Sequence, residues 1–139
     1  ALKLALLLLF LQQGAPCVYY GTEAALAGGP DAEQSGGPEP ACREAFPWGE
    51  PWPADLRSTI AGLADLRRNH PKLIRGDLQW QPTGRDGLLG RASGGLSVWV
   101  NRSTSQSLEI QPGTSTIWTC GTFDGHALAP QSAVVDLQG

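Results

Sequence analysis

The residues that could perform chemistry in this 139-residue chain are mainly carboxylates, since histidine and cysteine are scarce. Paired carboxylates can act as general acid and base, and the acidic residues of one region are Glu23, Asp31, Glu33, Glu39, Glu44 and Glu50. The sequence holds no Gly-x-Ser-x-Gly, Walker or His-Glu-x-x-His motif. Cys17, Cys42 and Cys120 lie far apart, so we expect buried free thiols, no metal site and no cofactor. No complete catalytic site is present in these patterns.

Glu23 differs from the other carboxylates because it follows a short β-prone run, residues 17–20, that ends at Gly21. At the carboxyl end of a parallel strand, α/β proteins place their ligand sites. Contact between Glu23 and a substrate is one interpretation. The other is a structural carboxylate that accepts hydrogen bonds from loop amides, which is the commoner role.

The segment before Glu23 predicts a buried helix and a buried strand. Residues 1–12 are strong helix formers and apolar nearly all round, which predicts a helix over residues 1–11. Gly14 is expected in the left-handed conformation, and Pro16 prevents continuation of the helix. A secretion signal or lipoprotein anchor is the alternative, but Pro16 replaces the small residue required before Cys17. We therefore expect a helix–strand step from a parallel sheet whose other strands precede Ala1, and a cytoplasmic protein.

The rest of the chain predicts a loop, a second helix and a β domain. Residues 24–53 are rich in Gly, Pro and acidic residues, whereas residues 54–70 have an amphipathic helical pattern that Pro71 ends. Short β-prone runs follow at residues 73–80, 87–91, 96–100, 107–110, 114–120 and 133–137. Their spacing predicts an antiparallel β-sandwich. The fold class is thus α+β, with one domain over residues 1–71 and an all-β domain over residues 72–139.

The bulk composition excludes some partners. The net charge of −3 gives no positive surface for nucleic acid or an anionic membrane. The apolar run at residues 4–11 is far shorter than the roughly 20 residues that a membrane span needs. Homo-oligomerisation is left open.

Several motifs together resemble the α-amylase superfamily, glycoside hydrolase family 13. GAPCVYYGTE is similar to the G-x-P-x-x-Y-Y-G-x-E signature that marks the eighth strand of its (β/α)8 TIM barrel, and the matching residues are Gly14, Pro16, Tyr19, Tyr20, Gly21 and Glu23. ACREAFPW resembles the C-R-x-x-F/M-x-W element of neopullulanases, cyclomaltodextrinases and maltogenic amylases, although residues 32–40 look like an insertion. Residues 63–80 resemble the eighth barrel helix entering a C-terminal β domain, and residues 128–138 resemble its closing strand.

The resemblance implies a retaining glycosidase that cleaves α-1,4 glucosidic bonds of α-glucans or cyclodextrins, and it leaves open whether α-1,6 bonds are cleaved as well. Such a reaction uses two carboxyl groups about 5–5.5 Å apart, and by resemblance the whole catalytic trio precedes Ala1, so the chain would be an inactive C-terminal fragment. Arg43, Asp31 and Trp48 would contribute to substrate binding. A salt bridge from Arg43 to Asp31 or Glu44, and core packing of Trp48, are the structural alternatives.

Two other functions stay open from the sequence. A transglycosylating relative that acts on sucrose or trehalose would keep the family and change the reaction. A secreted or lipid-anchored β-sandwich that binds carbohydrate without catalysis would belong to a different class, and it would need residues 4–11 as a signal.

Overall fold

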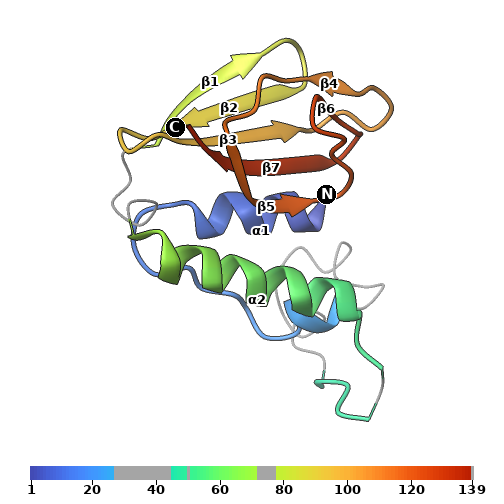
Figure 1. The fold of residues 1–139 in the computed structure, drawn as a ribbon. Coiled ribbons are helices and arrows are strands. Elements are labelled where there is room, and N and C mark those ends of the chain that lie inside the picture. Colours follow the sequence, from blue (N-terminus) through green and yellow to red (C-terminus); the bar gives the residue numbers. More distant parts are fainter. Residues whose placement is uncertain (27–44, 50, 72–77, 139) are drawn as a thin grey trace, which may run out of the picture. The chain divides into compact units, whose positions relative to one another are not determined.

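A computed structural model of the chain describes residues 1–26, 45–49, 51–71 and 78–138 (Figure 1). By its contacts the chain divides into two units, one formed by residues 1–16 together with 61–139 and the other by residues 17–60. The first unit holds the first helix, the second half of the second helix and the β domain. The second unit holds the segment after Pro16, the aromatic residues near position 50 and the start of the second helix.

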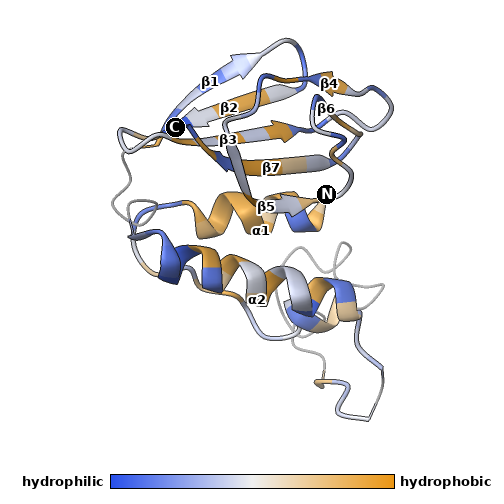
Figure 2. Ribbon diagram, in the orientation of Figure 1, coloured by the Kyte–Doolittle hydropathy of each residue, from blue (hydrophilic) through white to orange (hydrophobic). Residues whose placement is uncertain are grey.

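The two helices form where the sequence predicts them. Helix α1 (Leu2–Phe10) buries Leu4, Leu6, Leu7 and Phe10, and it is apolar along nearly its whole surface (Figure 2). Helix α2 (Ala54–Asn69) has alternating polar and apolar sides, as an amphipathic pattern requires. No helix in the described part of the chain is both long enough and apolar enough to cross a bilayer.

The β domain consists of a five-stranded and a two-stranded antiparallel sheet. The larger sheet has the order β1 (Gln79–Thr83), β2 (Gly87–Arg91), β3 (Leu96–Asn101), β7 (Ser132–Leu137) and β5 (Ser115–Cys120). The smaller sheet pairs β4 (Leu108–Glu109) with β6 (Ala127–Leu128). Every strand pair is antiparallel, which confirms the predicted α+β class and the antiparallel β domain.

The larger sheet is buried on both faces. On one face a core of Leu89, Trp99, Ile110, Leu128 and Val134 lies between the two sheets. The alternate residues of β3 and β7 point to the opposite face, and Val98, Val100, Ala133 and Val135 are all fully buried there. Helix α1 lies along that face (Figure 1), with Lys3 close enough to influence Cys120 of β5 and its C-terminal end beside Trp80 of β1. A sheet covered on both sides explains why every residue of β3 is buried.

Asn101 joins the end of β3 to the loops that carry the smaller sheet. Its side-chain Nδ2 donates to the carbonyl oxygens of Gln106 (2.8 Å), Leu128 (3.0 Å) and Ala129 (3.0 Å). Its Oδ1 accepts from the backbone N–H of Ser103 at 3.0 Å. Only 2% of Asn101 is exposed, so this buried amide is fully satisfied and fixes the loops relative to the strand.

Three predictions about the elements need correction. Residues 17–20 form no strand, and Tyr19 and Tyr20 are 57% and 42% exposed rather than buried. A strand needs a neighbour to satisfy its backbone groups, and none of the described residues pairs with this run. The free thiol of Cys120 is buried as expected, but that of Cys17 is exposed. The first β-prone run yields a strand only from Gln79 onward, and residues 73–77 of that run lie outside the described residues.

Candidate functional site

The structure describes only part of the predicted site. Arg43 and Asp31 lie outside the described residues, as do Glu44 and Cys42. The six residues of the Gly14–Glu23 motif and Trp48 are described. The geometry of the site therefore comes from the motif segment and from the aromatic residues near Trp48, all of which except Gly14 and Pro16 belong to the unit formed by residues 17–60.

A buried arginine holds the chain at the start of the motif. The Arg67 guanidinium donates to the carbonyl oxygens of Phe10, Gln12 (2.9 Å) and Gly14 (2.6 Å). The last carbonyls of a helix lack partners within that helix, so Arg67 from α2 caps the C-terminal end of α1 and the turn that follows. Gly14 in this turn has φ +83°, the left-handed conformation that the sequence predicts.

Arg67 lies in the last turn of α2, where a basic residue ordinarily interacts with the C-terminus of its own helix. The signal that could have identified it is its position. Residue 67 follows Leu63 by four residues, so it lies on the apolar face of α2 that also carries Leu56 and Leu63. Only 9% of Arg67 is exposed, and a charged residue on a buried face requires hydrogen-bond partners.

The motif segment makes a tight turn at Gly21. Its φ of +87° suits glycine, and a Cβ at this position would come within 2.5 Å of the Leu26 side chain. The backbone N–H of Leu26 donates to the Gly21 carbonyl at 2.9 Å, and the 3-10 helix η1 (Thr22–Ala24) lies within this loop. Glu23 is half-buried in the first turn of η1. Among the described residues no hydrogen bond to its carboxylate is formed. The described structure therefore favours neither substrate contact nor a structural role for Glu23.

Trp48 belongs to a cluster of three aromatic rings. The ring centroid of Phe46 lies 4.6 Å from that of Trp48 and 4.8 Å from that of Trp52, and the centroids of the two tryptophans are 6.1 Å apart. Trp52 donates from Nε1 to the Pro47 carbonyl at 3.0 Å, and the Arg57 guanidinium lies 5.6 Å from the Trp52 ring centroid. Trp48 is nevertheless 78% exposed. Packing on Phe46 thus orients an indole whose surface is largely available to a ligand.

The described site can bind, but it holds no evident catalytic or metal centre. Tyr19 and Tyr20 stack at 4.8 Å between centroids, and both rings are exposed like that of Trp48. Exposed aromatic rings offer apolar surface with a polar tip. In the described residues no group of three or more His, Cys, Asp or Glu side chains is arranged to hold a metal ion.

Comparison with known proteins places this fold among carbohydrate-degrading enzymes. No protein-family model matches the chain. An amylopullulanase from Thermoanaerobacter thermohydrosulfuricus is 37% identical over 78 residues, which is 56% of this chain and 5% of that protein. A cyclomaltodextrinase from Bacillus sp. is 35% identical over 80 residues, or 57% of this chain and 13% of that protein.

Among solved structures, the cyclic α-maltosyl-(1→6)-maltose hydrolase from Arthrobacter globiformis matches the whole chain with a TM-score of 0.72 and 28% identity. The antiparallel sheet corresponds to the C-terminal β domain of a glycoside hydrolase. The resemblance noted from the motifs is therefore confirmed: the chain is similar to enzymes of the α-amylase superfamily, of the cyclomaltodextrinase- and neopullulanase-like kind. The chain spans 31% of the Arthrobacter enzyme, and less of the other two relatives.

Proposed function

We propose that this chain is the C-terminal part of a retaining enzyme that hydrolyses α-1,4 and also α-1,6 glucosidic bonds of α-glucans or cyclodextrins. The observation that carries the proposal is the similarity of the entire chain to a hydrolase of a cyclic α-glucan, at 28% identity. In this proposal residues 1–71 end the catalytic barrel and residues 72–139 form the β domain. The catalytic carboxylates belong to an earlier part of the enzyme, and this chain contributes a wall of the sugar site.

The loop that carries Arg43 would hold the substrate. Arg43 matches the arginine of the family motif, and a guanidinium suits fixed hydrogen bonds to sugar hydroxyls or to an acidic partner such as Asp31. Trp48 supports this role because its ring is packed on one side by Phe46 and is still 78% exposed. The names of the three relatives describe hydrolases, which favours hydrolysis over transglycosylation.

The experiment is substitution of Arg43 in the full-length enzyme. If Arg43 contacts the sugar, Arg43→Ala removes a charged hydrogen bond worth about 1.5–3 kcal/mol, so kcat/KM for maltotriose falls roughly tenfold to a hundredfold. The melting temperature stays unchanged. Arg68→Ala is the matched control, because Arg68 is exposed and its only ion pair is with the equally exposed Asp65 among the described residues; this variant keeps the normal kcat/KM.

A different outcome would assign Arg43 to the structure of the loop. In that case Arg43→Ala lowers the melting temperature, and the enzyme that remains folded keeps its kinetics. A normal kcat/KM would mean that Arg43 does not contact the substrate, and that the proposed contribution of this chain to the sugar site is wrong.

A further inference from the structure

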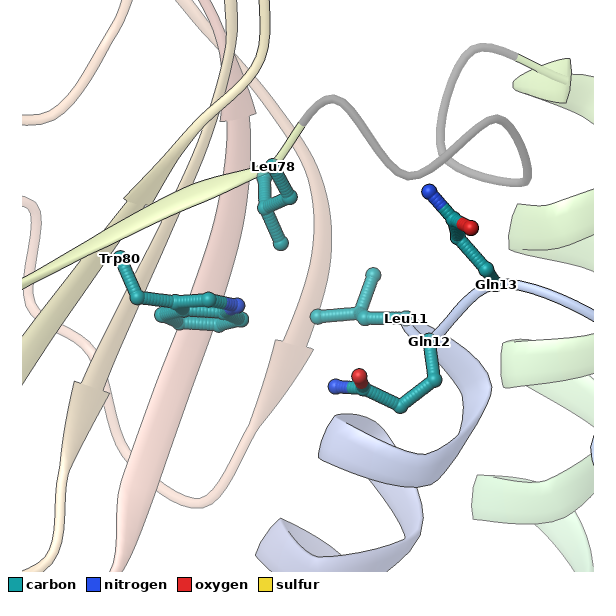
Figure 3. Close-up of a pocket in the computed structure, with 5 residues that line it drawn as sticks. All are labelled: Leu11, Gln12, Gln13, Leu78 and Trp80. Carbon is teal, nitrogen blue, oxygen red and sulfur yellow. The ribbon is translucent and has the colours of Figure 1, made fainter.

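A cleft of about 330 Å³ lies between the C-terminal end of α1 and the beginning of β1. Its described lining consists of Leu11, Gln12, Gln13, Leu78 and Trp80 (Figure 3). All these residues belong to the unit formed by residues 1–16 and 61–139, whereas Trp48 belongs to the other unit. This volume is at the small end of the range for ligand pockets, which suits one or two sugar rings.

The indole of Trp80 is held against the sheet on one side. Trp80 is the cross-strand partner of Gly90, and a Cβ at Gly90 would lie only 2.9 Å from Cζ3 and 3.0 Å from Cε3 of the indole. Glycine at position 90 therefore lets the six-membered ring approach the backbone closely. Trp80 is half-exposed, and the remainder of its ring lines the cleft together with the apolar side chains of Leu11 and Leu78.

Two carboxamides supply polar groups to the same cleft. Gln12 donates from Nε2 to the Leu8 carbonyl at 3.1 Å, which orients its side chain. Its Oε1 accepts no hydrogen bond from the described residues. Gln13 adds a second exposed carboxamide. The Arg67 guanidinium fixes the backbone of this turn through the carbonyls of Gln12 and Gly14, so the amide groups project from an ordered segment.

The chemistry of this lining favours a neutral ligand with one apolar and one polar side. None of the five described lining residues in Figure 3 is charged, so their side chains suit a neutral ligand better than an ion. A pyranose ring presents an apolar face of C–H groups that can pack on an indole, and its rim of hydroxyls can exchange hydrogen bonds with carboxamides. Pockets that combine an aromatic surface with a few placed polar groups are typical of small-ligand sites.

We propose that this cleft is a second saccharide-binding site, which takes an end or a segment of an α-glucan chain through residues other than Arg43 and Trp48. The choice of an α-glucan rests on the proposed function, whereas the site itself rests on Trp80, Gln12 and their surroundings. The affinity of such a small open site is weak, and its use is to hold a long substrate that is also engaged elsewhere.

The test is an NMR titration of the 139-residue chain with maltotriose. The indole N–H signal of Trp80 is assigned by its loss in Trp80→Phe. We expect saturable shifts of this signal and of the Gln12 side-chain amide, with a Kd of about 1–10 mM. Trp80→Ala weakens binding by about tenfold or more. Trp48→Ala is the matched control, since it removes another exposed tryptophan and leaves the Trp80 shifts unchanged.

Gln12→Leu provides a second variant, because Trp80 also packs on Gly90 and its removal can disturb the fold. Gln12 is exposed, so this variant keeps the dispersed spectrum of the folded chain and loses affinity severalfold. If maltotriose produces no saturable shift up to about 50 mM, or if Gln12→Leu binds normally, the proposal is wrong. Equal binding of cellobiose overturns the assignment to α-glucans.

Shifts of the Gln12 side-chain amide that disappear in Trp48→Ala and persist in Trp80→Ala would also overturn the proposal for the cleft, and they would support the loop site instead. The proposed hydrolytic function is judged by the kinetics of the full-length Arg43→Ala enzyme. The two proposals can therefore fail separately.

Discussion

Asp136 in β7 is a carboxylate without exposure and without a hydrogen-bond partner among the described residues. It faces the same side of the sheet as Val134, and its neighbour Gly113 is so close that a Cβ there would lie 2.6 Å from Oδ1. Burial raises the pKa of Asp136, and the nearby backbone N–H of Gly113, which does not form a regular hydrogen bond with this carboxylate, offsets only part of this effect. The folded chain therefore favours the protonated form of this carboxyl group.

This raised pKa makes a prediction about stability and pH. Below the ordinary aspartate pKa of about 3.9, Asp136 is neutral in both the folded and unfolded chain. As the pH rises above that value, the unfolded chain ionises first, so Asp136 lowers the free energy of unfolding until its folded pKa is passed. Asp136→Asn lacks this loss of stability, so its free energy of unfolding relative to that of the natural chain should increase as the pH rises above about 4.

Urea unfolding of both chains across this pH range measures the difference directly. The pKa of Asp124 is lowered by the backbone N–H groups of His126 and Ala127, so this residue favours folding as the pH rises. Asp124 is present in both chains, so its effect cancels in the difference between them. Glu109→Gln, which removes an exposed carboxylate, is the matched control. A stability difference between the two chains that does not grow as the pH rises above about 4 would contradict the argument.

At the level of elements, Arg67 connects the second half of α2 to the end of α1. It is adjacent in sequence to Arg68, yet the two arginines lie in opposite environments. Arg67 is 9% exposed and donates to three carbonyls, whereas the Arg68–Asp65 pair is 73% and 59% exposed. Hydrogen bonds from a buried charge are strong, and exposed ion pairs contribute little.

We expect Arg67→Ala to lower the free energy of unfolding by about 2–4 kcal/mol, because it leaves the carbonyls at the end of α1 unsatisfied. Arg68→Ala should lower it by less than about 1 kcal/mol. Chemical unfolding monitored by circular dichroism compares the two variants. Equal losses would mean that the cap contributes nothing to stability.

The elements also show how far the sequence could predict the fold. Alternating apolar residues placed β2, β3, β5 and β7 within one residue of their ends, because each strand has a buried face and a clear turn on either side. Strand β6 was missed, since Ala127 and Leu128 form it only by pairing with β4. The strand predicted at residues 17–20 was wrong because β propensity is local, whereas a strand depends on neighbours that these residues lack in the described chain.

The candidate site could be predicted less completely than the fold. The motif match identified Gly14 and Gly21, whose positive φ values explain the need for glycine. The sequence does not identify Trp80 as a ligand-binding residue, because an aromatic residue in a β-prone run normally packs in a core. Its availability depends on the end of α1, which is about 70 residues away in sequence and reaches the same cleft only through tertiary packing.

On the scale of the whole molecule, the described chain is a β domain with helix α1 on one face, together with a separate unit that carries Tyr19, Tyr20 and Trp48. In the proposed function the catalytic trio belongs to another part of the enzyme. The purified 139-residue chain should therefore release no product from maltotriose or cyclodextrin above a vector control. Measurable turnover by the pure chain would contradict the assignment of the trio to a preceding part of the enzyme.

The buried amide of Asn101 has a consequence for production of the protein. Asn101-Arg102-Ser103 spells the acceptor sequence for N-linked glycosylation. The sugar would have to attach to Nδ2, the atom that donates to three carbonyl oxygens inside the fold. The folded chain therefore presents no acceptor at this position. In a eukaryotic secretory host, a glycan attached during synthesis would block the loops from closing on β3, so a bacterial cytoplasm is the safer host for expression.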